Sequence, residues 1–335
     1  MTRFERCALG VLGVAVAGAA VAGFLTPVGQ KTAIPKAALE REPAQPAVEW
    51  VIQVAMESDP RSRGPEVVAS ADHLSRTFAR LGYDLESVFR KDQPVPRVFL
   101  ASLPRDMKEI REIKTRKALF FKSILPLVLQ ANEEILKDRK RLWQLRTAMR
   151  MGRQVSAVDR LWLSVIREKY RVKSRDIDEL LLRVDVIPPS MALAQAAEES
   201  GWGTSRFVRE GNAIFGQWTF SKSDAGIAPL KRDPGKNHRI KAFDSLQDSV
   251  RAYALNLNTN QAYAGLRALR ADMRRAGSPI DGSALARTLS KYSERGMAYV
   301  NSIRSIISVN RLRQLDDARL AGEPDEVPLQ MAGDV

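Results

Sequence analysis

Cysteine and histidine are almost missing from this chain of 335 residues. The only cysteine is Cys7, and the only histidines are His73 and His238. This inventory excludes a disulfide framework, a cysteine nucleophile and a histidine-rich metal site. Carboxylates are therefore the residues that remain for catalysis, and no motif calls for a metal or an organic cofactor.

Acidic residues are outnumbered in the chain. There are 39 Asp and Glu against 53 Lys and Arg, which gives a net charge of +14 and an isoelectric point near 10.1. Such a balance favours an anionic partner, either nucleic acid or an anionic cell wall or membrane surface. No zinc-finger spacing or other nucleic-acid-binding motif accompanies the charge, so we expect the wall or the membrane and no nucleic acid.

A long apolar run occurs at the N-terminus, from Cys7 to Leu25, with Arg3 and Arg6 before it. A positive start, an apolar core and small-residue cleavage sites are typical of a secretory leader. The run is also nearly long enough to cross a bilayer as an uncleaved anchor. We therefore expect residues 1–30 to be a signal peptide or membrane anchor, and the protein to reside in the periplasm or cell envelope.

The next part of the chain carries no motif with chemistry. Residues 31–47 are rich in proline, alanine and charge and are expected to be a linker. Residues 48–185 show helical periodicity, clearest over 65–81 and over 105–149, and Ser156 with Asp159 fits a capping box. We expect a helical N-terminal region there, and a disordered acidic tail over 315–335.

The stretch from Pro188 to Phe220 predicts a central helix. Pro188 and Pro189 disfavour helix before them, so Ser190 is expected to cap a helix that ends near Gly201. Its many alanines allow close packing, which indicates a buried helix. Two glutamates in such a setting are unexpected.

Glu198 and Glu199 lie about a hundred degrees apart on that helix, so their environments must differ. Glu199 shares a face with Ala192, Gln195 and Ala196. The negative end of the helix dipole and nearby apolar groups both disfavour an ionised carboxylate there and raise its pKa. A raised pKa suits a general acid. The alternative from spacing alone is a solvated pair on an ordinary helix.

After this helix the pattern changes briefly to strands. Residues 215–220, 227–231 and 238–243 are separated by turn signals and predict a small β-hairpin lobe. Ser245 with Asp248 then predicts the start of another helix, and more helices follow up to 312. The fold class predicted from these patterns is mainly α with one β excursion (α+β).

The motif A-Q-A-A-E-E-S-G-W-G-T-S at 194–205, followed by G-N-A-I-F-G at 211–216, resembles glycoside hydrolase family 73, the peptidoglycan-cleaving N-acetylglucosaminidases. Later segments, S-V-R-A-Y at 249–253 and K-Y-S-E-R-G-M-A-Y at 291–299, are similar to the bacterial Bax-type members. The resemblance covers roughly 187–312. It implies a lysozyme-like domain over 186–314 with a groove between an α-lobe and a β-lobe. The glutamate before S-G-W-G is the family's catalytic acid, which corresponds to Glu199 and not to Glu198.

The second catalytic group has several candidates, because the β-lobe glutamate common in the family has no counterpart in this hairpin. Asp233 is the nearest carboxylate and Asp224 the next. Asp233 precedes Pro234 and Gly235, so a turn explains it as well as catalysis does. A further alternative is assistance by the 2-acetamido group of the substrate.

The resemblance also implies residues around the scissile sugar. Tyr292 and Tyr299 match the two tyrosines of a family segment in the groove, Tyr292 as a catalytic-site residue and Tyr299 as a substrate-binding one. Phe215 and Trp218 are candidates for stacking on sugar rings, or else core aromatics. Asn212 is a candidate to orient a backbone or an acetamido group.

Three functions follow as alternatives. The preferred one is an exported endo-β-N-acetylglucosaminidase that binds peptidoglycan glycan strands and cleaves between N-acetylglucosamine and N-acetylmuramic acid. The second is a lytic transglycosylase, which cuts the other glycan bond. The third is a wall-binding protein without catalysis.

Overall fold

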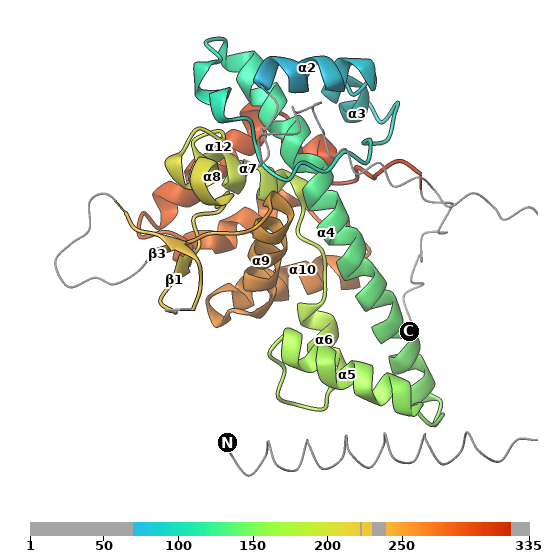
Figure 1. Cartoon of the computed structure of the whole chain (residues 1–335). Helices are drawn as coiled ribbons and strands as arrows, with labels where there is room; N and C mark the ends of the chain where they lie inside the picture. The colour runs from blue at the N-terminus through green and yellow to red at the C-terminus, as the bar shows by residue number, and fades with distance from the viewer. Residues whose placement is uncertain (1–69, 222, 230–238, 323–335) are drawn as a thin grey trace, which may run out of the picture. The chain divides into compact units, whose positions relative to one another are not determined.

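A computed structural model of the chain describes residues 70–221, 223–229 and 239–322 (Figure 1). The predicted leader, the predicted linker and Asp233 lie outside the described residues. The described chain is mainly helical with one small antiparallel sheet, which confirms the predicted fold class. None of the helices in these ranges is long and apolar enough to cross a membrane.

The described chain begins with two short helices whose caps explain their starts. Helix α2 (Ala71–Arg80) is capped by Ser70, and α3 (Leu85–Phe89) is capped by Asp84. At the start of α3 the Asp84 carboxylate accepts the Ser87 amide, which satisfies one of the free amides of the first helical turn.

One long helix packs against several of the other helices. A 3₁₀ turn, η2 (Arg105–Glu109), leads into α4 (Ile113–Arg150), which is continuous over 38 residues through Pro126. The side chains from about Leu119 to Ile135 are largely buried, and α4 packs against α2, α6, α7 and α9 (Figure 1). The helical periodicity seen over 105–149 therefore corresponds mainly to one long helix, α4.

Two helices fold back beside the C-terminal half of α4. They are α5 (Ala157–Lys169) and α6 (Ile177–Arg183). The predicted capping box is confirmed, since Ser156 Oγ accepts the Asp159 amide at 3.1 Å and donates to its carboxylate at 2.7 Å. This arrangement starts α5 at the predicted place.

The central helix α7 (Pro189–Ser200) is buried along almost its whole length. It begins one residue before the predicted Ser190 cap, because proline fits the first position of a helix. The cap is supplied by Asp316, whose carboxylate accepts from Ser190 N and Oγ at 2.9 Å each and from Gly282 N at 3.0 Å. Gly282 starts α11 (Gly282–Leu285), so one side chain serves two helix starts.

The β-lobe follows α8 (Arg206–Gly211). Its strands are β1 (Trp218–Thr219), β2 (Gly226–Ile227) and β3 (Arg239–Lys241), ordered β1-β3-β2 and antiparallel throughout. Between β1 and β3, Trp218 pairs with Ile240, and between β2 and β3, Ile227 pairs with Ile240. The predicted hairpin lobe is therefore present as a three-stranded sheet.

The remaining elements close around α7. They are α9 (Leu246–Thr259), η3 (Gln261–Tyr263), α10 (Ala264–Arg275), η4 (Ala286–Lys291), α12 (Met297–Val309) and η5 (Leu312–Leu315). Ser245 caps α9 as predicted. Helices α4, α9, α11 and α12 and the turn η5 all contact α7 or its neighbours, which leaves α7 in the middle.

A single hydrophobic cluster runs from Ala71 to Leu320. It spans the predicted boundary at 185, so the two predicted regions share a core, although the boundary itself stays a prediction. The disordered tail was predicted to begin at 315, and for residues 315–322 this is wrong. Asp316 caps two helices there, and the buried Leu320 bridges to Val95.

Candidate active site

Glu199 lies in the last turn of α7, where the helix reaches the surface of the core. The preceding alanines are fully buried, whereas Glu199 is partly exposed. Gly201 ends the helix in the left-handed conformation, with φ 57°. The helix therefore places one carboxyl group at the edge of the apolar interior.

A chain of hydrogen bonds leads to Glu199 from the core. The Tyr253 hydroxyl donates to Gln195 Oε1 at 2.7 Å, and Gln195 Nε2 donates to the Tyr299 hydroxyl at 2.9 Å. Because that hydroxyl accepts from Gln195, its own proton is available for its hydrogen bond to the Glu199 carboxyl. All three of these donors are buried.

The hydroxyls of these tyrosines stay protonated near neutral pH. Burial raises the pKa of Tyr253 and of Tyr299 above the usual range, and the nearby Glu199 adds to both shifts. Burial likewise raises the pKa of Tyr292. The tyrosine side of Glu199 therefore offers neutral hydroxyl groups.

Tyr292 and Tyr299 lie side by side. Their rings stack with centroids 5.4 Å apart and planes 6° from parallel. The Tyr292 hydroxyl donates to the Phe215 carbonyl at 3.5 Å, which links η4 to the loop after α8. Tyr299 is only 1% exposed, so its position favours holding Glu199 over touching a sugar; its predicted binding role stays a prediction.

The loop after α8 lies against Glu199. A Cβ placed on Gly216 would be 3.6 Å from Glu199 Oε2, and the φ of Gly216 is 57°. Phe215 is buried and stacks on Tyr253 at 3.8 Å, which favours the core alternative for this ring. Asn212 has a positive φ and donates to the Phe243 and Asp244 carbonyls, so it orients backbone here.

Glu198 has a different environment, as the helical spacing predicted. Its carboxylate accepts from Arg295 at 2.6 Å and from Ser302 Oγ at 2.9 Å. Both partners of Glu198 come from the segment that leads into α12 and from α12 itself. A carboxylate held this way is committed to an ion pair.

Burial is the main cause that raises the pKa of Glu199 above its usual value. The hydrogen bond from Tyr299 and the charge of Arg295 oppose the shift, and the negative charge of Glu198 adds to it. One of the two adjacent glutamates is therefore ion-paired, and burial raises the pKa of the other above its usual value. Such a group can donate a proton to a leaving oxygen.

The β-lobe carries the exposed aromatics. Trp218 is 55% exposed and packs edge-on to Phe220, with centroids 6.5 Å apart. This exposure is compatible with sugar stacking, which stays a prediction. Asp224 accepts from Thr219 at 2.7 Å and pairs with Lys241 at 3.3 Å, and both contacts lower its pKa. Its carboxylate is therefore engaged within the sheet.

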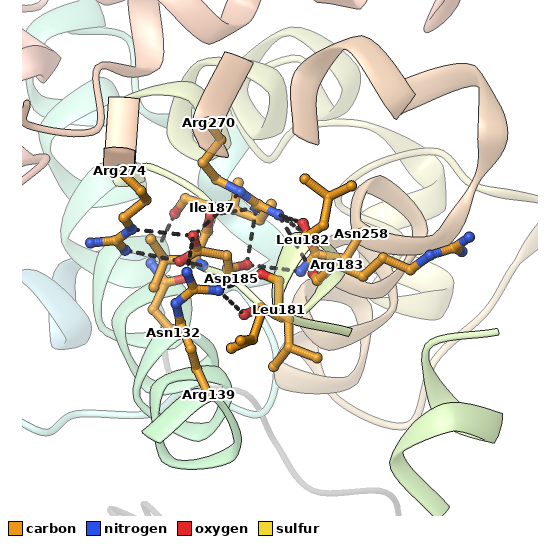
Figure 2. Close-up of polar contacts among 12 residues, drawn as sticks. Asn132, Arg139, Leu181, Leu182, Arg183, Asp185, Ile187, Asn258, Arg270 and Arg274 are labelled. Atoms are coloured by element: carbon orange, nitrogen blue, oxygen red, sulfur yellow. Dashed lines mark hydrogen bonds and ion pairs between the residues drawn. The ribbon is translucent and has the colours of Figure 1, made fainter. Parts of the chain in front are cut away.

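The sequence did not indicate a second buried carboxylate, Asp185. Figure 2 shows it among arginines of α4 and α10. Arg274 Nη2 donates to it at 2.9 Å, while Arg139 and Arg270 lie at 3.5 and 3.8 Å. The guanidinium groups of Arg139 and Arg270 also donate to backbone carbonyls at and just after the end of α6, for example from Arg270 to Val186 O at 2.7 Å.

Asp185 has the opposite titration behaviour from Glu199. Burial alone would raise the pKa of Asp185, but the three arginines outweigh burial and hold that pKa below its usual value. The cluster ties α4, α6 and α10 together, so its role is structural. Within the described residues, no group of three metal-binding side chains occurs.

Together the fold and the site define a class, a mainly helical protein with a protonatable carboxyl at the end of its central helix and a small sheet nearby. Residues 175–312 match the family described as mannosyl-glycoprotein endo-beta-N-acetylglucosaminidase. The chain is 33% identical over 217 residues to "Protein bax" of Escherichia coli (strain K12), covering 63% of this chain and 75% of that protein. No solved structure matches. The chain belongs to the glucosaminidase family, in its Bax-type group.

Proposed function

We propose that this chain is a peptidoglycan hydrolase that cleaves the β-1,4 bond between N-acetylglucosamine and N-acetylmuramic acid. Glu199 serves as the general acid and protonates the leaving oxygen. The observation that carries the proposal is the contrast between the two adjacent glutamates, because burial raises the pKa of Glu199 while Glu198 is held by Arg295. Membership of the glucosaminidase family supports the substrate class.

The remaining chemistry is assigned to neutral groups and to the substrate. Glycoside cleavage also needs stabilisation of the oxocarbenium-like centre. The charged groups that act on the pKa of Glu199 are Glu198 and Arg295, and Asp224 is paired within the sheet. This arrangement supports assistance by the substrate 2-acetamido group. Asp233 remains the alternative second carboxylate and lies outside the described residues.

The test is digestion of purified peptidoglycan by the full chain, with the soluble fragments analysed by mass spectrometry. Wild type is expected to release reducing N-acetylglucosamine ends. Glu199→Gln is expected to lower the rate by about 10²-fold to 10⁴-fold, the usual contribution of a general acid. Glu198→Gln is the matched control on the same helix and is expected to keep most of the activity.

Three outcomes would contradict the proposal. Equal rates for wild type and Glu199→Gln would remove Glu199 from the chemistry. Anhydromuramyl ends would identify a lytic transglycosylase instead. Glycan binding without turnover in every variant, including wild type, would identify a wall-binding protein.

We also propose that the protein acts in the cell envelope. The apolar run from Cys7 to Leu25, preceded by Arg3 and Arg6, supports export or anchoring. Fractionation of the producing cells, with and without this run, tests the proposal. Recovery of both forms in the cytoplasm would contradict it.

A further inference from the structure

The hairpin made by the C-terminal half of α4 and by α5 concentrates positive charge. From Lys137 to Arg175, just before the cap of α6, there are thirteen Lys and Arg against three Asp and Glu. This excess of ten accounts for most of the net charge of +14. Some of it is paired, since Asp178 binds Arg146 and Arg150. The exposed basic residues at the turn and at both ends of α5 include Arg153, Arg160, Arg171, Lys173 and Arg175.

The α5 helix also has two apolar faces, and only one of them is covered. Leu163 and Ile166 are buried in the core. Val158, Leu161 and Val165, at helical spacing on another face, are 70%, 69% and 55% exposed. These three residues are called the α5 outer face below. A helix that is apolar on both sides normally has both sides covered.

The exposed apolar side chains are clustered, which distinguishes them from the scattered ones of an ordinary surface. Thirteen large apolar side chains are exposed in the described ranges. Five of them lie within the seventeen residues from Met149 to Val165, the other two members of that group being Met149 and Met151 at the connection into α5. Met149 and Met151 therefore add exposed apolar surface at the turn of the hairpin.

A basic cleft of ≈ 480 Å³ lies in the same hairpin. It is formed between α4 and the start of α5, and its walls include Lys137, Lys140 and Arg141 together with Asp159. Arg141 donates to Asp159 at 2.7 Å, so the cleft is braced across the two helices. Its basic walls suit a phosphate-bearing head group.

We propose that the hairpin docks on the surface of an anionic phospholipid bilayer. The α5 outer face enters the head-group region, and the surrounding Lys and Arg contact lipid phosphates. Interfacial helices combine an apolar face with basic flanks in this way. The proposal is independent of the catalytic function.

Charge complementarity favours an anionic bilayer as the partner of the hairpin. A second copy of the chain would bring a surface with the same excess of positive charge, which opposes self-association. A soluble anionic polymer would satisfy the basic residues but leave the α5 outer face in water. An anionic bilayer satisfies both.

The experiment uses the full chain with Cys7→Ser, so that a new cysteine is the only thiol. Leu161→Cys carries an environment-sensitive fluorophore, and Val309→Cys is the matched control, because Val309 is 73% exposed on α12. The N-terminal apolar run can bring either protein to a vesicle, so the label reports which face meets the lipid. Circular dichroism checks the fold of each labelled protein.

With vesicles of phosphatidylglycerol and phosphatidylethanolamine, emission from position 161 is expected to shift to shorter wavelength, and emission from position 309 is expected to stay unchanged. Vesicles of phosphatidylcholine alone are expected to give no shift. Arg153→Gln is expected to weaken docking about fivefold, which corresponds to the loss of one basic residue near a charged surface. Arg287→Gln, exposed on η4, is expected to leave docking unchanged.

Four results would overturn the proposal. Position 161 could fail to respond to anionic vesicles, or respond equally to phosphatidylcholine. A shift that grows with protein concentration in the absence of lipid would identify a second copy as the occupant. The same shift with inorganic polyphosphate in the absence of lipid would identify an ionic polymer.

Discussion

Two carboxyl groups, the buried Asp185 and the partly exposed Glu199, have opposite surroundings. Asp185 faces three arginines, which hold its pKa down in spite of burial. Glu199 receives a hydrogen bond from a neutral tyrosine, has another glutamate next to it in sequence, and has its pKa raised by burial. The difference teaches that burial alone does not decide which way the pKa of a carboxyl moves. In these two groups the charge of the nearest donors decides the direction.

The largest effect on stability is expected when Asp185 loses its charge. Asp185→Asn leaves Arg139, Arg270 and Arg274 without a counter-charge in the interior, and breaking one side of a buried ion pair costs about 3–5 kcal/mol. Urea unfolding measures this change. Asp272→Asn is the control, because its pair with Arg275 is exposed, and surface pairs contribute about 0–1 kcal/mol.

The stability lost in Asp185→Asn should itself depend on pH. A lowered folded pKa means that the contribution of Asp185 is present above its unfolded pKa, near 3.8, and is lost as the pH falls through the lower folded value. The difference between wild type and variant should therefore shrink in acid. A difference that stays constant down to pH 2 would contradict the assignment.

The next effect concerns the neutral donors around Glu199. Gln195→Met keeps the volume but leaves the Tyr253 and Tyr299 hydroxyls without their partner, at a cost of about 1–3 kcal/mol of stability. It also releases the orientation of Tyr299, so the pKa of Glu199 should rise further. The alkaline limb of the pH–rate profile is then expected to move to higher pH.

Tyr299→Phe should move that limb in the same direction, because it removes the same hydrogen bond from Glu199. A loss of rate in Gln195→Met with the limb unchanged would show that Gln195 serves packing alone. The pH–rate profile therefore distinguishes a role of Gln195 in positioning Tyr299 from a role in packing alone.

The smallest effect is a gain of stability in Glu199→Gln. Because the folded pKa of Glu199 is raised, its contribution is fully present below the unfolded pKa and is lost as the pH rises through the folded value. At neutral pH the variant should therefore be more stable than wild type, because Gln carries no charge that burial can penalise. Thermal unfolding at pH 4 and pH 7.5 measures it, and an equal or lower stability at pH 7.5 would contradict the sign.

Local signals in the sequence predicted several helix ends and the different environments of the two adjacent glutamates. Gly201 predicted the end of α7, Ser156 and Ser245 predicted the starts of α5 and α9, and the spacing of Glu198 and Glu199 predicted different environments. Each of these depends on residues a few positions apart. Caps, turns and helical faces are short-range properties.

The partners of the buried polar groups could not be predicted in this way. Asp316 caps α7 from 126 residues away, and Arg270 and Arg274 reach Asp185 and its neighbours from 84 to 89 residues away. Gln195 was placed on the face of Glu199, but its bonds to Tyr253 and Tyr299 depend on how α9 and α12 pack. Such pairings depend on tertiary contacts, which a local sequence pattern does not predict.

Carbon-13 NMR titration of the glutamate side-chain carboxyls tests the central claim most directly. The Glu199 resonance, assigned by its disappearance in Glu199→Gln, should titrate above 4.5, the usual pKa of this side chain. Glu198→Gln should lower that midpoint by removing a negative charge, and Arg295→Gln should raise it. A Glu199 midpoint at or below 4.5 in wild type, unmoved by either substitution, would contradict the account.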